Sequence, residues 1–298
     1  MSLSWTGERL VTELDSAYGT FEHLHRYALA LELCKNKNVL DIASGEGYGT
    51  NLIGSVAEFV LGVDISFEAV EHAKEKYQRE NIEFKVGNTS KIPLESNTVD
   101  VVVSFETIEH IKEQNLFLSE VKRVLKKDGI LIISTPDKTI YSERDPANRF
   151  HIKELFTNEF KQLISTYFNQ VELYQQRIFI GSVVSHEEIE SGEYLFFDGD
   201  FYNIKAELNE HNFFNKPFFN IIIASDIQFK NLNFPSISLF SAYKAYVQER
   251  ERLITEIESK NRKLASVVSS PSYKAYAWIV DNFINLKRKV FQQISKKK

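Results

Sequence analysis

A glycine-rich turn between an apolar run and a helical pattern constrains the fold of this chain more than any other feature. Residues 39–42 (Val-Leu-Asp-Ile) read as a buried strand, and residues 48–56 have the apolar spacing of a helix. Gly45, Gly47 and Gly49 fall at the junction. Glycines let the backbone approach a ligand closely, and a helix N-terminus adds free N–H groups with a partial positive charge. The turn therefore predicts a ligand site at the end of this strand.

An acidic residue ends the next predicted strand. Residues 59–64 form a second apolar run that ends at Asp64, 23 positions after Asp41. A carboxylate there suits a ribose, because both hydroxyls of the diol can donate to it. The nearest alternative is a dinucleotide-binding oxidoreductase. The turn lacks the sixth-position glycine of that fingerprint, however, and Asp41 lies where such folds usually keep an apolar residue.

Predicted strands and helices alternate up to residue 224. The strands are expected at residues 38–42, 59–64, 82–86, 99–105, 130–134, 171–180 and 218–224, and the helices at residues 23–34, 48–56, 67–78, 114–125 and 158–167. The fourth helix is expected to stop at residues 126–129, where cations precede a glycine that can adopt positive φ. Such alternation predicts an α/β fold with parallel strands, right-handed crossovers and ligands above the carboxyl ends of the strands.

Four segments together resemble, in order and spacing, the successive motifs of class I S-adenosylmethionine-dependent methyltransferases. They are VLDIASGEGYGT, VLGVDIS, VGNTSKIPLESNTVDVVVSFETIEHI and VKRVLKKDGILIISTP, and the resemblance covers roughly residues 22–136. It implies a Rossmann-like seven-stranded, mostly parallel sheet with helices on both faces and an antiparallel final strand. It also implies S-adenosylmethionine as the cofactor and methyl transfer as the reaction.

The resemblance assigns the methionyl end of the cofactor to the glycine-rich turn. Gly45, Gly47 and the backbone that follows Asp41, including Ala43, are expected to lie against it. Arg26, on the helix before the first strand, is a candidate to bind the cofactor carboxylate through two parallel hydrogen bonds.

The nucleoside end is assigned to the next motifs. Asp64 is expected to hold the ribose, and Ile65 to contact the adenine. Asn88, followed by Thr89, stands where the family often has aspartate, and its amide oxygen can still accept from the adenine amino group. Phe105 resembles the residue that lines the methyl-donor pocket.

Two histidines are candidates for proton transfer. A sulfonium methyl group is already activated, so the enzyme positions an acceptor and manages one proton, and no metal site is predicted. An alcohol acceptor benefits from a general base, whereas a phosphate or carboxylate needs none. His110 follows the fourth strand and His151 follows the fifth, on the same edge of the sheet. Either could be the base, and the alternative for each is a purely structural histidine.

The N-terminal segments 5–9 (WTGER) and 22–27 (EHLHRY) narrow the resemblance. They look like the branch of bacterial methyltransferases associated with surface-polysaccharide assembly of the O-antigen type, and hence with lipopolysaccharide biosynthesis. This implies a glycan or lipid-linked glycan acceptor, methylated on a sugar hydroxyl or a terminal phosphate. The alternatives are a catalytically silent scaffold subunit of a glycan-assembly complex and a small-molecule methyltransferase.

Composition indicates a cytoplasmic protein, with peripheral attachment at the inner face of the membrane as an alternative. Cys34 is the only cysteine, the N-terminus has no apolar signal region, and no run of 18 apolar residues occurs. Residues 1–236 carry 23 Lys and Arg against 36 Asp and Glu. This acidic body predicts no nucleic-acid partner, because binding phosphates requires clustered cations.

The domain organisation is predicted from the same charge asymmetry. Residues 1–236 form the methyltransferase domain, with an aromatic insertion at about 181–217 that is either an acceptor-binding wall or a stabilising cover. Residues 237–270 have a heptad-like pattern typical of a coiled coil, and residues 271–298 an apolar helical face with a basic end. From residue 237 onward, 13 Lys and Arg face 5 Asp and Glu. A protein partner, self-association and an anionic membrane surface are the candidate contacts of this region.

Overall fold

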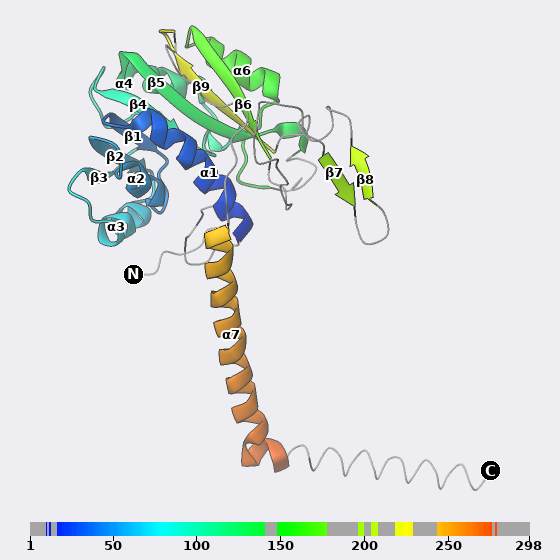
Figure 1. The fold of residues 1–298 in the computed structure, drawn as a ribbon. Helices are drawn as coiled ribbons and strands as arrows, with labels where there is room; N and C mark the ends of the chain where they lie inside the picture. The colour runs from blue at the N-terminus through cyan, green and yellow to red at the C-terminus, as the bar shows by residue number, and fades with distance from the viewer. Residues whose placement is uncertain are drawn as a thin grey trace, which may run out of the picture. The chain divides into compact units, whose positions relative to one another are not determined.

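The computed structural model describes residues 10, 12, 17–140, 148–177, 196–199, 204–207, 218–228, 243–275 and 278. The chain forms two compact units, Met1–Phe240 and Ser241–Lys298. The first unit carries a central sheet covered by helices (Figure 1). The second unit carries the long helix α7.

Seven strands form the sheet in the order β3-β2-β1-β4-β5-β9-β6. They are β1 Asn38–Ile42, β2 Phe59–Asp64, β3 Ile82–Val86, β4 Val99–Ser104, β5 Leu125–Pro136, β6 Gln170–Gln176 and β9 Phe219–Ser225. Strands β3, β2, β1, β4 and β5 run parallel, and β9 is antiparallel to both β5 and β6. The predicted Rossmann-like sheet with its antiparallel final strand is confirmed.

The described part of the predicted aromatic insertion is a hairpin. Strand β7 (Phe196–Gly199) pairs antiparallel with β8 (Ile204–Glu207), apart from the main sheet. The other residues of 181–217 lie outside the described part of the chain, so the role of this segment as a wall of the acceptor site stays a prediction.

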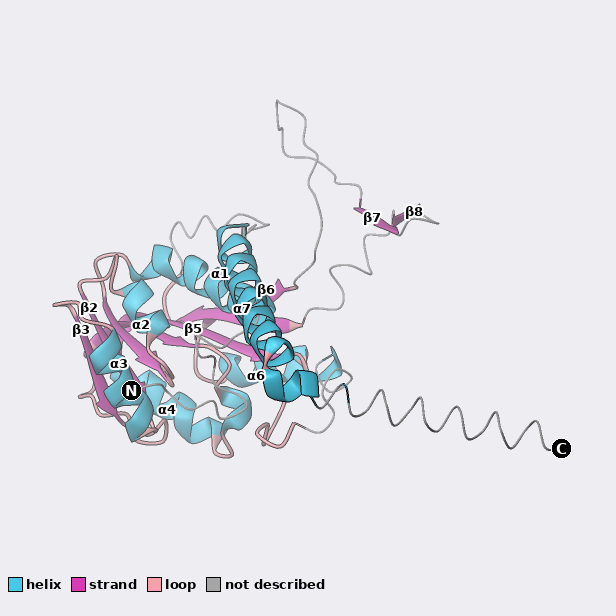
Figure 2. Ribbon diagram, turned by 90° about the horizontal axis from the view of Figure 1, so that it is seen from below, coloured by secondary structure: helices cyan, strands magenta, loops and turns pink. Residues whose placement is uncertain are grey.

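Helices pack on both faces of the sheet, as predicted (Figure 2). They are α1 Ala17–Cys34, α2 Tyr48–Ile53, α3 Phe67–Lys76, α4 Gln114–Val124 and α6 Thr157–Ser165, with a short 3-10 helix, η1, at Ile108–His110. Adjacent strand residues point to opposite faces. Val39 therefore packs with α1 and α2, whereas Leu40 packs with α4 and α6. Helix α1 begins six residues before the predicted start, because its polar first turns lack the apolar periodicity on which that prediction relied.

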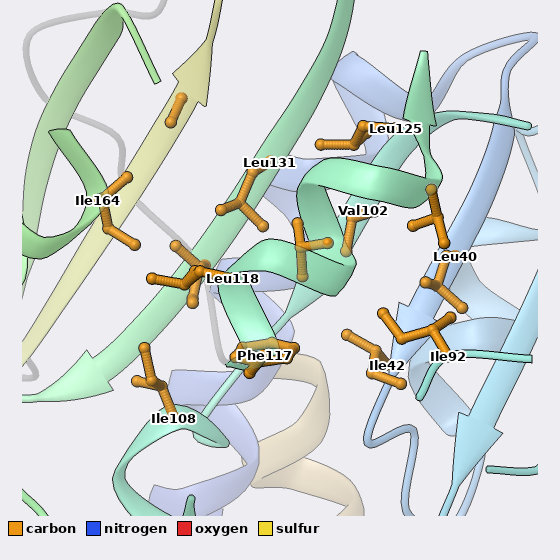
Figure 3. Close-up of a cluster of buried hydrophobic side chains, with 14 of the residues drawn as sticks. Leu40, Ile42, Ile92, Val102, Ile108, Phe117, Leu118, Leu125, Leu131 and Ile164 are labelled. Carbon is orange, nitrogen blue, oxygen red and sulfur yellow. The ribbon is translucent and has the colours of Figure 1, made fainter. Parts of the chain in front are cut away.

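The larger core cluster holds α4 against the sheet (Figure 3). Phe117 and Leu118 of α4 are fully buried, as are Leu40, Val102 and Leu131 from three neighbouring strands. Burying one such side chain contributes roughly 1.5–3 kcal/mol. This packing places η1 and the ends of β4 and β5 beside the glycine-rich turn.

The predicted helix cap at residues 126–129 is wrong. Helix α4 ends at Val124, and β5 already begins at Leu125, which pairs with Val99 of β4. Lys126 Nζ donates to Asp100 Oδ1 over 2.8 Å. Gly129 lies in the strand; among the described glycines only Gly45 and Gly47 have positive φ. The register with β4 is interrupted here: pairing stops at Leu125 and resumes at Ile130, opposite Val101.

Asp41, the acid inside β1, is a buried structural carboxylate. Its Oδ2 accepts a hydrogen bond from Thr50 Oγ1 at 2.7 Å, and its Oδ1 accepts from the Tyr27 hydroxyl at 3.5 Å. The side chain therefore ties α2 and α1 to the sheet. Burial raises the pKa of Asp41 to about 6, against the lowering effect of these two hydrogen bonds.

Replacing Asp41 with asparagine should change how stability depends on pH. The folded-state pKa of about 6 exceeds the unfolded value of about 3.9, so the folded chain keeps a proton that the unfolded chain has lost. The parent therefore loses stability as pH rises from about 4 to about 6. The asparagine side chain cannot titrate, so the stability of the variant relative to the parent should rise by about 2–3 kcal/mol over this range. Urea unfolding at pH 4 to 7 measures this difference, and a constant difference would contradict the shifted pKa.

The second unit contains α7, Tyr243–Ser269, and a further helical turn at residues 271–275. The apolar side chains of Ile254, Ile257 and Leu264 are exposed, with the spacing predicted from the heptad pattern. Pairs four residues apart, such as Glu256 with Lys260, support the helix. Among the described residues, no helix combines the length and the apolar character needed to cross a membrane. Most of the predicted basic helix at 271–298 lies outside the described part.

Candidate functional site

A cavity of about 470 Å³ opens at the carboxyl ends of β1, β4 and β5. Its lining comes from the chain before α1, from α1, the glycine-rich turn, the end of β4 with η1, the end of β5 with the segment after it, and the start of β9. The lining residues are Leu10, Glu22, His23, Tyr27, Ala43, Ser44, Gly45, Glu46, Tyr48, Phe105, Glu106, Glu109, His110, Pro136, His151 and Phe219. A groove of about 570 Å³ runs along α3 and β3, but it lies at the outer edge of the sheet. We place the site in the cavity, where a doubly wound sheet binds its ligands.

Left-handed backbone shapes the glycine-rich turn. Ala43, Gly45 and Gly47 have φ values of 63°, 54° and 94°. A Cβ on Gly47 would lie 2.7 Å from the Cβ of Ala73 and 2.9 Å from the Phe84 ring, so both the conformation and the close packing require glycine here. The turn folds back over the end of β1, which places the residues from Ala43 onward along the cavity.

Asp64 ties this turn to the one after β2. Its Oδ2 accepts from the Gly45 N–H at 2.8 Å, and its Oδ1 accepts from the Ser66 N–H at 2.9 Å. A carboxylate can accept about four hydrogen bonds, so two positions remain for a diol. Ile65 beside it is 71% exposed, and Phe67 is similarly exposed, leaving an apolar surface next to the acid.

The predicted cofactor residues fall into two groups. Ala43, Gly45 and Phe105 line the cavity. The others, which do not line it, are Arg26, Asp41, Gly47, Asp64, Ile65, Asn88 and Thr89. The Asn88 amide oxygen accepts hydrogen bonds from the Ser90 N–H at 2.9 Å and from the Ser90 hydroxyl at 3.0 Å. The Asn88 oxygen that was expected to accept from the adenine amino group therefore already accepts hydrogen bonds within its own turn.

Arg26 is completely buried and only partly satisfied. Its Nη1 donates to Gln176 Oε1 at 2.7 Å and lies 3.8 Å from Glu106 Oε1. Its guanidinium lies over the Phe219 ring, 4.7 Å from the centroid. Its Nε and Nη2 have no hydrogen-bond partner among the described residues. Two unsatisfied N–H groups match a bidentate anion in their chemistry, but Arg26 is fully buried and does not line the cavity, so its contact with the cofactor carboxylate stays a prediction.

An aromatic group forms one wall of the cavity. The Tyr27 ring meets the Phe105 ring edge to face at 5.0 Å and the Tyr48 ring at 5.5 Å. The Tyr48 hydroxyl and His23 Nδ1 are 2.8 Å apart. Burial, with a smaller effect of Arg26, lowers the pKa of His23 well below its usual value, so this imidazole is neutral. Neither His23 nor Tyr48 was predicted to be a site residue.

The structure brings the two predicted histidines together. The rings of His110 and His151 lie 5.0 Å apart, centroid to centroid. The N–H groups of Ile152 and Lys153 donate to the Glu109 carbonyl at 2.9 and 3.0 Å, which fixes the segment after β5 against η1. Backbone pairing between distant parts of the chain therefore makes the histidine pair.

Two glutamates complete this wall, and sequence reasoning missed both. Glu106 has a positive φ of 48°, and its Oε1 accepts from the Ser134 hydroxyl at 2.6 Å. Glu109 Oε2 accepts from the Thr135 hydroxyl at 3.0 Å. Burial and the charge of Glu106 raise the pKa of Glu109 well above its usual value. The spacing E-x-x-E-H directly after β4 was the available signal.

Known proteins resemble this chain in sequence. The family model of the methyltransferase domain matches residues 40–133. A Mycolicibacterium smegmatis protein named "Probable S-adenosylmethionine-dependent methyltransferase" is 38% identical over 174 residues, which cover 57% of this chain and 67% of that relative. A ubiquinone/menaquinone biosynthesis C-methyltransferase of Campylobacter jejuni is 34% identical over 115 residues, covering 35% of this chain and 47% of that relative.

Solved structures share the fold. The crystal structure of an S-adenosylmethionine-dependent methyltransferase from Archaeoglobus fulgidus superposes with a TM-score of 0.50 at 18% sequence identity. The match covers 70% of this chain and 94% of the other. At that identity the likeness concerns the fold alone.

Proposed function

The chain belongs to the S-adenosylmethionine-dependent methyltransferases, and from this premise we propose that it methylates a sugar hydroxyl of a bacterial surface glycan. S-adenosylmethionine supplies a methyl group already activated on a sulfonium sulfur. The enzyme therefore has to hold the acceptor in line and manage one proton.

The residues of the site fit this cofactor. The left-handed turn brings backbone to the cavity without side chains in the way, and Asp64 keeps two positions for ribose hydroxyls. Arg26 offers two unsatisfied N–H groups for a carboxylate. Ile65 would cover one side of the adenine, while the occupied amide oxygen of Asn88 makes the contact to the adenine amino group the weakest assignment.

The polar side chains on the wall of the cavity indicate which chemical class of methyl acceptor fits best. Glu106, Glu109, His110 and His151 line it together with Glu22. Carboxylates repel an anionic acceptor, which disfavours a terminal phosphate. Many charged and polar groups also disfavour an apolar quinone ring, the substrate class of the Campylobacter relative. A neutral acceptor with several hydroxyl groups fits best.

His110 and His151 would receive the proton of the acceptor. The hydroxyl loses this proton as its oxygen bonds to the methyl carbon, and a positioned imidazole typically accelerates such a step about 10²- to 10⁴-fold. His110 Nδ1 lies 3.0 Å from the Phe150 carbonyl, to which it donates, so its Nε2 carries the lone pair. The assignment to the surface-polysaccharide branch is supported by the resemblance of segments 5–9 and 22–27.

Transfer of a radiolabelled methyl group from S-adenosylmethionine tests the proposal. Incubation with lipid-linked glycans should label the sugar, and the label should stay on the sugar after aqueous hydrofluoric acid has cleaved the phosphate esters. Short-chain quinones, under the same conditions, should remain unlabelled. Label that this cleavage releases from the glycan would replace the hydroxyl with a phosphate acceptor. Cofactor binding without transfer to any glycan would favour the scaffold alternative.

We further propose that the C-terminal unit attaches the enzyme to an anionic membrane surface, with a protein partner or self-association as the alternatives. A chain cut after Phe234 should stay folded and bind S-adenosylmethionine, because the last strand of the sheet ends at Ser225. Its sedimentation with anionic vesicles should be lost, since the removed part carries 13 Lys and Arg against 5 Asp and Glu from residue 237 onward. Aggregation of the cut chain would show that the tail belongs to the core. Unchanged sedimentation would place the attachment elsewhere.

A further inference from the structure

We propose that Glu109, His110 and His151 form a binding site for a divalent transition-metal ion on the wall of the cavity. One ligand atom of each residue lies within 4.8 Å of the other two. The sequence-based expectation was that the chain has no metal site. In assigning the ion a role toward the acceptor, the inference rests on the proposed function; the binding of the ion does not.

The first observation is an unsatisfied buried carboxylate oxygen. The Glu109 side chain is 1% exposed, and its Oε1 has no hydrogen-bond partner among the described residues. Its other oxygen is held by Thr135. His110 Nε2 lies 3.8 Å from this oxygen. A buried polar atom without a partner is costly, and a cation between Glu109 and the histidines would satisfy it.

The second observation is the way both imidazoles are held. His110 Nδ1 lies 3.0 Å from the Phe150 carbonyl, and His151 Nδ1 lies 2.6 Å from Glu154 Oε1. Each acceptor favours a proton on Nδ1, which leaves the lone pair on Nε2. Metal-binding histidines are held in this way, with the second ring nitrogen donating to a carbonyl or a carboxylate.

The donor set indicates the class of ion. Two imidazoles and one carboxylate suit Zn²⁺, Co²⁺, Mn²⁺ or Fe²⁺, whereas Mg²⁺ and Ca²⁺ prefer oxygen ligands alone. Bonds of about 2.1 Å place tetrahedral ligands about 3.4 Å apart. The 3.8 Å between Glu109 Oε1 and His110 Nε2 is close to this, and the distances to His151, which are within 4.8 Å, would have to shorten by at most about 1.4 Å.

Three protein ligands leave a position open toward the cavity, as in catalytic metal sites. An ion there would bind the acceptor oxygen and favour its deprotonated form. Because the ion would occupy Nε2 of both histidines, it would replace them in activating the acceptor, and the hydroxyl proton would pass to solvent.

Titration of the full-length protein with Co²⁺ tests the proposal, because ligand-field absorption in the visible range reports coordination without turnover. The parent should bind one Co²⁺ per chain with nitrogen ligands. His151→Ala and Glu109→Gln should weaken binding about 100-fold or more, since each removes a ligand. Glu154→Gln, which removes the carboxylate at His151 Nδ1, should weaken it about tenfold. His25→Ala, a histidine that does not line the cavity, should bind as the parent does.

Calorimetry with S-adenosylmethionine on the same proteins separates this proposal from the proposed function. Absence of stoichiometric Co²⁺ binding by the parent, or equal binding by folded His151→Ala and the parent, overturns the metal site while cofactor binding persists. Loss of Co²⁺ binding in His151→Ala and Glu109→Gln but not in His25→Ala supports it, even if the glycan is not methylated. Thermal melts test whether each variant is folded. If Glu109→Gln does not fold, the comparison of His151→Ala with the parent decides whether the metal site exists.

Discussion

Replacing His151 with alanine should lower the turnover number about 10²- to 10⁴-fold and leave the affinity for S-adenosylmethionine nearly unchanged. His151 lies on the cavity wall with His110, and neither was assigned to the cofactor. The loss should fall on turnover because the proton of the acceptor is lost only as the new bond forms. Initial rates at saturating cofactor, with calorimetric affinities for each variant, measure both quantities.

His110→Ala should lose a similar factor, and the double variant should be little worse than either single one. Residues that act as one unit on one proton, or on one ion, give losses that do not add. The His25→Ala protein is the control for removing a histidine outside the cavity. Full turnover in both single variants would mean that neither imidazole acts on the acceptor. An anionic acceptor, which needs no base, would then be the better interpretation.

The local sequence pattern was sufficient to predict the bounds of the first three strands. The predicted bounds of β1, β2 and β3 agree with the structure to the residue, because each is a short run between clear turn residues. The start of β5 was missed for the opposite reason. Leu125 continues the helical apolar spacing of α4, but its pairing with Val99 on the neighbouring strand draws it into the sheet. Such pairing is a tertiary effect that sequence spacing does not show.

In the candidate site, too, sequence position predicted some features, whereas others depend on tertiary contacts. Position after a strand was enough to place His110 and His151 on one edge of the sheet. Their contact depends on hydrogen bonds from Ile152 and Lys153 to the Glu109 carbonyl, which join residues more than 40 apart in the chain. The role of Glu109 depends on burial at 1% exposure, which the letters E-x-x-E-H do not reveal.

For Arg26 and Asn88, the structure shows contacts that the resemblance to the family did not indicate. Arg26 was assigned to the cofactor carboxylate, and in the structure its buried guanidinium already has an anionic neighbour, Glu106, whose Oε1 lies 3.8 Å from Nη1. Asn88 was expected to replace an aspartate at the adenine, but the hydrogen bonds from Ser90 engage its oxygen. Both assignments stay predictions.

Asp64→Ala should weaken binding of S-adenosylmethionine by about 3 kcal/mol, or roughly 150-fold, the loss of two hydrogen bonds to a charged group. It should also lower stability by about 1–3 kcal/mol, because the N–H groups of Gly45 and Ser66 lose their acceptor. Asp64→Asn is the matched control, since it keeps the shape and one acceptor oxygen. We expect an intermediate loss of affinity with less loss of stability.

A ligand without ribose hydroxyls isolates the contact itself. The 2′,3′-dideoxy form of S-adenosylhomocysteine should bind the parent much more weakly than S-adenosylhomocysteine does. In Asp64→Ala the two ligands should bind almost equally, because the carboxylate that distinguishes them is gone. Calorimetry on the four pairs gives the coupling between the side chain and the diol. A coupling near zero, in a variant that melts as a folded protein, would remove Asp64 from the ribose site. Its hydrogen bonds to Gly45 and Ser66 would then be its whole role.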